Sequence, residues 1–78
     1  MVAYARFRKK VAKRHSETLM ELAIRAAVNH DLECWWPECH GDNMVFIFQG
    51  NRCNDAAAIF VINCSLKGIR GRIGKPEN

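Results

Sequence analysis

Basic side chains crowd the first 14 residues of this 78-residue chain, where they could bind phosphate groups. The stretch 3–14 contains half of the chain's 12 lysine and arginine residues and no acidic residue. A guanidinium group offers a planar fork of N–H donors that matches phosphate oxygens, and lysine adds a compact positive charge. The candidate residues here are Arg6, Arg8, Lys9, Lys10, Lys13 and Arg14, with Tyr4 beside them as a surface on which an unpaired base could stack.

The remaining charge is divided by sign along the chain. Residues 16–66 carry seven acidic side chains against Arg25 and Arg52, whereas residues 67–78 carry four basic side chains against one acidic one. Both ends are therefore basic and the middle is acidic, which indicates a directed electrostatic partner. Arg70 and Arg72 near the C-terminus join the candidates for binding an anionic partner.

Cysteine and histidine residues raise two further chemistries, a zinc site and a nucleophilic thiol. The weak candidates for zinc ligands are Cys34, Cys39, His40 and Cys53. Their C-x4-C-H spacing differs from the tight pairs of structural zinc sites, and adjacent ligands fit poorly around one tetrahedral ion. A nucleophile built from Cys39, His40 and Asp42 lacks any sign of an oxyanion hole. We therefore expect no metal, no cofactor and no enzymatic activity, with Cys34 and Cys64 as small core residues and Cys39 as a free thiol in a loop.

Two features could contact another protein. Trp35 and Trp36 must point to opposite faces if they lie in a strand, so one can fill the core and the other is expected to be exposed or half-exposed. An exposed tryptophan is a common interface anchor and would serve docking, base stacking or a homodimer. Glu17 and Glu21 lie on the acidic stripe of a predicted helix and form a second candidate surface.

Length and composition predict one small domain, residues 1–78, with a frayed end at 75–78. No apolar run approaches 18 residues, so no membrane-spanning helix is expected. The basic N-terminus is not followed by the apolar segment of a secretion signal. We therefore expect an intracellular protein that does not contact membranes. Its four cysteines would allow three pairings into two disulfides, but they are expected to stay reduced.

The first half of the chain is predicted to contain a strand, a helix and a hairpin. Residues 2–8 alternate apolar and polar side chains, which favours a strand, although a helix is the alternative. Residues 9–15 are expected to be a basic connector, followed by an amphipathic helix over 17–30 with Ser16 as its N-cap. A short strand over 33–37, closed by Pro37, a loop over 38–43 and a strand over 44–49 would then form the hairpin. Both alternating sets of the last strand are apolar, so the face that Phe46 and Phe48 occupy is left open.

The second half is predicted to contain a helix and a final strand. A helix over 55–66 would be capped by Asn54 or Asp55 and followed by Gly68, although the run 59–62 could also form a strand. Residues 69–73 alternate isoleucine with Arg70 and Arg72, which is typical of a strand with one apolar and one basic face.

The resulting order, β-α-β-β-α-β, predicts an α+β fold of the ferredoxin-like split βαβ type. Its sheet would be four-stranded and antiparallel, with two helices on one face. The first and last strands would be neighbours, so Tyr4, Arg6, Arg8, Arg70 and Arg72 would share the open face.

These expectations favour a small non-enzymatic binding module whose basic sheet face engages nucleic acid or a nucleoprotein complex. The alternative is a compact inhibitor or adaptor of the kind that phages and mobile elements encode, such as anti-CRISPR or host-takeover proteins. That alternative would bind and block a host protein complex, and its location would be the host cytoplasm.

Overall fold

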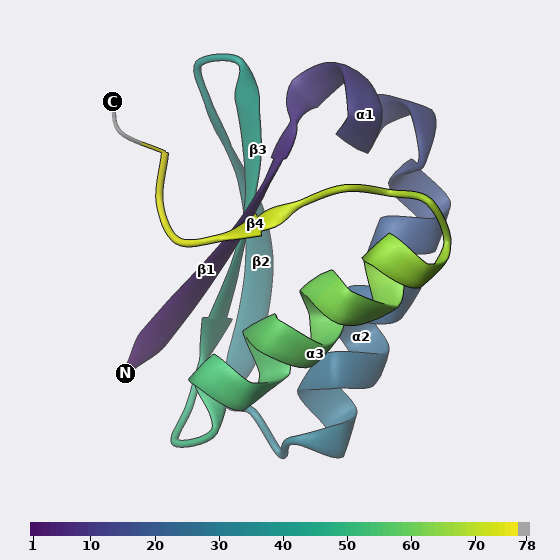
Figure 1. The fold of residues 1–78 in the computed structure, drawn as a ribbon. Helices are drawn as coiled ribbons and strands as arrows, with labels where there is room; N and C mark the ends of the chain where they lie inside the picture. Colours follow the sequence, from purple (N-terminus) through teal and green to yellow (C-terminus); the bar gives the residue numbers. More distant parts are fainter. Residues whose placement is uncertain (77–78) are drawn as a thin grey trace.

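The computed structural model describes residues 1–76, which form a sheet covered by helices (Figure 1). Along the chain the elements are β1 (Val2–Arg8), α1 (Lys9–Arg14), α2 (Ser16–Asn29), β2 (Cys34–His40), β3 (Asn43–Gln49), α3 (Cys53–Leu66) and β4 (Arg72–Ile73). The strands are ordered β2-β3-β1-β4, and each neighbouring pair is antiparallel. The predicted α+β class with a four-stranded antiparallel sheet is confirmed, and the first and last strands are neighbours as expected.

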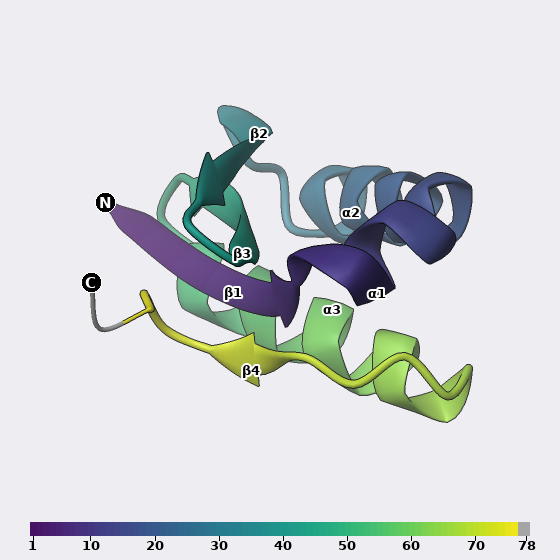
Figure 2. The ribbon, with the colours of Figure 1, turned by 90° about the horizontal axis from the view of Figure 1, so that it is seen from above.

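The core lies between one face of the sheet and the helices α2 and α3, which pack against each other and leave the other face open (Figure 2). In β1 the alternation of the sequence places Ala3, Ala5 and Phe7 in this core. In β3, Phe46 pairs with Ala5 and Phe48 pairs with Ala3. Because cross-strand partners share a face, both phenylalanine side chains lie on the core face, which the sequence alone left open.

An aromatic cluster fills the centre of the core around Phe60 of α3. The ring centroids of Phe7, Phe46 and Phe48 lie 5.6, 5.1 and 5.3 Å from that of Phe60. These rings meet edge-on or tilted, which is the favoured geometry for aromatic pairs. Full burial of each ring contributes about 2 kcal/mol of hydrophobic stabilisation.

The predicted basic connector over residues 9–15 is wrong, because Lys9–Arg14 forms helix α1. Alanine, lysine and arginine are strong helix formers, and burial of Ala12 anchors this short helix to the core. The main chain bends at His15, and α2 begins directly afterwards. Ser16 is therefore the first residue of α2 rather than its N-cap, and the capping position falls to His15 without a side-chain hydrogen bond.

The predicted short strand and loop over 33–43 are also wrong, because β2 continues through Pro37 to His40. In a two-residue hairpin the terminal pair, His40 with Asn43, is hydrogen-bonded, and hydrogen-bonded pairs alternate from there. The nitrogen of Pro37 therefore faces the free edge of the sheet, where a missing N–H group costs no ladder hydrogen bond. Gly41, with φ +58°, supplies the left-handed residue that the tight turn requires.

The helix predicted over 55–66 is confirmed as α3, but it starts at Cys53 with Arg52 as N-cap, so neither Asn54 nor Asp55 caps it. Gly68 follows its end with φ +80°, as expected for a glycine at this position. The last strand is shorter than predicted, since only Arg72–Ile73 pairs with β1. Of the predicted frayed end, residues 77–78 lie outside the part of the chain that the structure describes.

Candidate functional site

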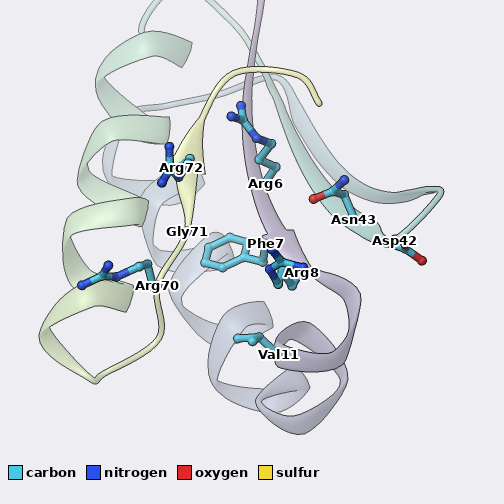
Figure 3. A pocket seen from close by; sticks show the side chains of 9 residues that line it. All are labelled: Arg6, Phe7, Arg8, Val11, Asp42, Asn43, Arg70, Gly71 and Arg72. Carbon is cyan, nitrogen blue, oxygen red and sulfur yellow. The ribbon is translucent and has the colours of Figure 1, made fainter. Parts of the chain in front are cut away.

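Basic side chains from both ends of the chain surround one hollow of about 550 Å³ beside the end of β1. Arg6 and Arg8 come from β1, Arg72 from β4, and Arg70 from the segment between α3 and β4 (Figure 3). The side chains of Phe7, Val11, Asp42 and Asn43 and the backbone of Gly71 complete the lining. The structure thus brings together two groups of arginines that are more than 60 positions apart in the sequence.

The four arginines flank this hollow rather than converge on one point. In Figure 3 the side chains of Arg70 and Arg72 extend toward α3, whereas Arg6 and Arg8 lie over β1. Arg70 precedes β4 and therefore lies outside the strands of the sheet, whereas Arg72 is the first residue of β4. Spread positive charge of this kind suits a chain of phosphates better than a single small anion.

The lysines of α1 extend the same surface. A second hollow is lined by Arg8, Lys9, Lys10, Lys13 and Asp42, and Lys13 and Arg14 line a third hollow at the start of α2. A backbone hydrogen bond of 2.7 Å from Lys9 N–H to Asp42 O ties α1 to the hairpin turn. We call the continuous surface the basic band, and its members are Arg6, Arg8, Lys9, Lys10, Lys13, Arg14, Arg70 and Arg72.

Within residues 1–76 no side chain of the basic band forms an ion pair shorter than 4.0 Å, although Asp42 and Glu17 also line its hollows, and the one such pair joins His40 and Glu38. Arg6 and Arg72 are direct cross-strand partners, and like charges in that arrangement destabilise a sheet. Arg6 is partly satisfied, because its Nη1 donates to Ile73 O at 3.1 Å and to Lys75 O at 3.2 Å. A bound phosphate would relieve the remaining repulsion.

Tyr4 lies on the open face of β1, and Lys75 of the C-terminal segment covers its ring. The Lys75 ammonium nitrogen lies 4.9 Å from the ring centroid, within the range of a cation–π contact. The tyrosine is therefore next to the basic band as predicted, but the stacking surface expected from the sequence is occupied in this conformation.

Trp36, Glu38 and His40 form a hydrogen-bonded set on the open face of β2, which the sequence analysis missed. Trp36 Nε1 donates to Glu38 Oε2 at 2.9 Å, and His40 Nε2 lies 2.8 Å from Glu38 Oε1. The hydrogen bond from Trp36 and then that from His40 lower the pKa of the Glu38 carboxyl below its usual value, and the charges of His40 and Lys75 act in the same direction. The spacing 36, 38, 40 would have revealed the set if the strand had been extended through Pro37.

Replacing Trp36 with phenylalanine should raise the pKa of Glu38 toward its ordinary value, because the indole N–H donor is lost. Since folding lowers this pKa, the hydrogen bonds stabilise the folded protein above the ordinary pKa, and that contribution disappears as the pH falls through the folded-state value. NMR titration of the Glu38 carboxyl carbon in both proteins measures the change. An unchanged pKa in the variant would contradict the role given to Trp36.

The predicted protein-contact residues are separated by the fold. Trp35 points to the helix side and stacks on Phe46, with ring centroids 6.3 Å apart and planes 16° apart, while Trp36 lies on the open face. The expectation of two opposite faces is therefore confirmed. Glu17 and Glu21 are exposed on α2, and Glu17 lies beside Lys13 and Arg14 of the basic band.

The four cysteines do not form a cluster. Cys34 and Cys39 are exposed on β2, whereas Cys53 and Cys64 are buried in α3, and no disulfide joins them. Cys34 is thus not the core residue that the sequence suggested, and Cys39 lies in a strand rather than a loop. Burial raises the pKa of the Cys64 thiol to about 12.

The weak zinc and nucleophile candidates find no support in this arrangement. Within residues 1–76 no three cysteine, histidine or acidic side chains form a group that could hold a metal ion. Cys39 and His40 are successive residues of β2, so their side chains point to opposite faces and cannot act together as thiol and base.

No helix in the described part of the chain is long and apolar enough to cross a membrane. Comparison with known proteins gave no match to a family model, to a curated protein or to a solved structure. The functional conclusion therefore rests on the geometry and charge of the surfaces described above.

Proposed function

We propose that this protein is a small non-enzymatic binding module whose basic band engages the phosphate backbone of nucleic acid, either free or within a nucleoprotein complex. The observation that carries the proposal is the joining of both basic ends of the chain into one band, whose side chains form no ion pair shorter than 4.0 Å among residues 1–76. Phosphate contacts supply most of the affinity in such binding, and arginine and lysine are the side chains that make them.

The proposal also includes a ferredoxin-like fold and an intracellular location, which the strand order and the free cysteines support. The strand order β2-β3-β1-β4 with helices on one face fits a ferredoxin-like split βαβ fold, to which α1 is an addition. That fold serves many functions, so it does not by itself favour one. Four free cysteines, two of them exposed, fit the reducing interior of a cell.

The test is a fluorescence-anisotropy titration of the wild-type protein with single-stranded RNA, single-stranded DNA and duplex DNA of one sequence, each at two salt concentrations. We expect binding that weakens steeply as salt rises, because each phosphate contact adds about 0.7 to the log–log slope for a single strand and about 0.9 for a duplex. Absence of binding to all three polymers at low salt would overturn the proposal.

A second candidate function is that of an inhibitor or adaptor that blocks a host protein complex. It is favoured by apolar side chains exposed on the outer surfaces of the two long helices, notably Ile24 and Val28 of α2 and Ile62 and Leu66 of α3. Exposed apolar side chains of this kind are common at protein interfaces. A protein that bound no nucleic acid at low salt, but retained a host protein complex through these side chains, would establish this function instead.

A further inference from the structure

On the open face of the sheet, two apolar side chains of β3 form a floor that longer side chains of the adjacent strands cover. Val45 and Ile47 point to this face, since they pair with Arg6 and Tyr4 of β1, yet they are only 0% and 4% exposed. Ile47 lies between Tyr4 and Trp36 in one cross-strand row. Long side chains therefore close over the floor, and two aromatic side chains stand on either side of Ile47. Two strand spacings, about 10 Å, separate their strands.

The C-terminal segment occupies one of these aromatic positions. The chain turns toward the open face after β4, as Figures 1 and 2 show, and Gly74 N–H donates to Tyr4 O at 2.8 Å. The Lys75 ammonium then lies over the Tyr4 ring, and Arg6 holds the carbonyl groups of Ile73 and Lys75. The contacts that hold this segment in place thus involve Arg6, a member of the basic band, and the aromatic ring beside it.

We propose that Tyr4 and Trp36 form a site for unpaired bases of single-stranded nucleic acid, and that Lys75 covers the Tyr4 position until such a strand binds. This inference rests on the proposed function, because the basic band would hold the phosphates of the same strand. An aromatic ring binds the face of an unpaired base by stacking, whereas bases within a duplex do not expose their faces. A base and Lys75 compete for the same ring, and a phosphate beside the base competes with Ile73 and Lys75 for Arg6.

If Lys75 covers the Tyr4 ring, the substitution Lys75→Ala should change single-strand affinity in the direction opposite to that expected from the loss of a positive charge. Lys75→Ala removes a positive charge, so general electrostatics predicts weaker binding to every polyanion. If Lys75 covers the base site, the same substitution should tighten binding to a single strand and leave binding to a duplex unchanged or weaker. The opposite signs for the two polymers separate the two explanations.

The experiment uses a fluorescein-labelled pyrimidine 12-mer as single-stranded DNA and as single-stranded RNA. The third ligand is duplex DNA, in which the DNA 12-mer is paired with its purine complement. Tyr4→Leu keeps apolar cover over Ile47 but removes the aromatic ring, and Tyr4→Phe is the matched control that retains it. We expect Tyr4→Leu to weaken single-strand binding by about fivefold or more, the lower range for one stacked base, and to leave duplex binding within about twofold. Tyr4→Phe should bind as the wild type does, and thermal melts check that the variants are folded.

Trp36 gives an independent readout through its fluorescence. In a Trp35→Phe background the emission comes from Trp36 alone. We expect single-stranded DNA to quench this emission and duplex DNA to leave it unchanged, because only an unpaired base can stack on the indole.

The outcomes separate the two proposals. A wild-type protein that binds none of the polymers overturns the proposed function, and this inference with it. A protein that binds single strands and duplex equally, with Tyr4→Leu unchanged and no quenching of Trp36, overturns only the base site. Equal weakening of single-strand and duplex binding by Lys75→Ala overturns the covering role of Lys75. A preference between the two single-stranded arms identifies whether RNA or DNA is the ligand.

Discussion

Replacing Gly71 with alanine should lower the free energy of unfolding by about 2–3 kcal/mol, the upper range for overpacking a core. A Cβ atom at position 71 would lie within 2.7 Å of three carbon atoms of the Phe7 ring. That ring cannot move aside freely, because it is buried and packs edge-on against Phe46 and Phe60. The φ angle of Gly71 lies outside the left-handed region, so the cost is one of contact rather than of backbone conformation.

Urea unfolding monitored by tryptophan fluorescence measures this change, and a double-mutant cycle identifies its cause. In a Phe7→Leu background the smaller side chain leaves room for the new methyl group, so Gly71→Ala should cost clearly less than in the wild type. Strictly additive effects of the two substitutions would contradict the proposed clash with the Phe7 ring.

The contact between Gly71 and Phe7 also explains how the basic band is assembled. A residue without a side chain lets the segment after α3 pass directly over the buried ring, and β4 then pairs with β1. This close approach places Arg70 and Arg72 at the hollow that Arg6 and Arg8 also line. One packing contact in the core therefore sets the geometry of the candidate site.

The parts of the fold that follow a regular hydrophobic period were predictable from the sequence. Alternation over residues 2–8 gave β1, and the broad apolar face of 17–30 gave α2. The neighbouring positions of β1 and β4 followed from the order of the elements, and from them the meeting of Arg6 with Arg72. The basic residues of the site were visible in the sequence as clusters at its two ends, although the helix that carries four of them, α1, was not predicted.

The errors arose where tertiary position overrides local sequence preference. Pro37 normally ends a strand, but on the outer strand β2 its nitrogen faces the free edge and the strand continues. The extension to His40 created the contacts of Glu38 with its two neighbours on the same face. The contact of Lys75 with Tyr4 joins residues 71 positions apart through a turn after β4, which no local pattern encodes.

Neutralising Arg70 and Arg72 together should weaken binding to single-stranded nucleic acid by about 30-fold. This estimate takes about 1 kcal/mol for each phosphate contact in a solvent-exposed setting. The log–log salt slope should also fall by about 1.4, since two contacts at about 0.7 each are lost. Anisotropy titrations of Arg70→Gln/Arg72→Gln at several salt concentrations measure both quantities. Arg6 is left intact because its guanidinium also holds the C-terminal segment.

The matched control is Arg25→Gln/Arg52→Gln, which removes the same charge from exposed positions outside the basic band. If the band is the binding surface, this control should change affinity and salt slope far less than the Arg70 and Arg72 pair. Equal losses in the two double variants would mean that net charge alone attracts the polyanion, and the band would then have no special role. Because both variants carry the same net charge, the difference between them measures the contribution of position.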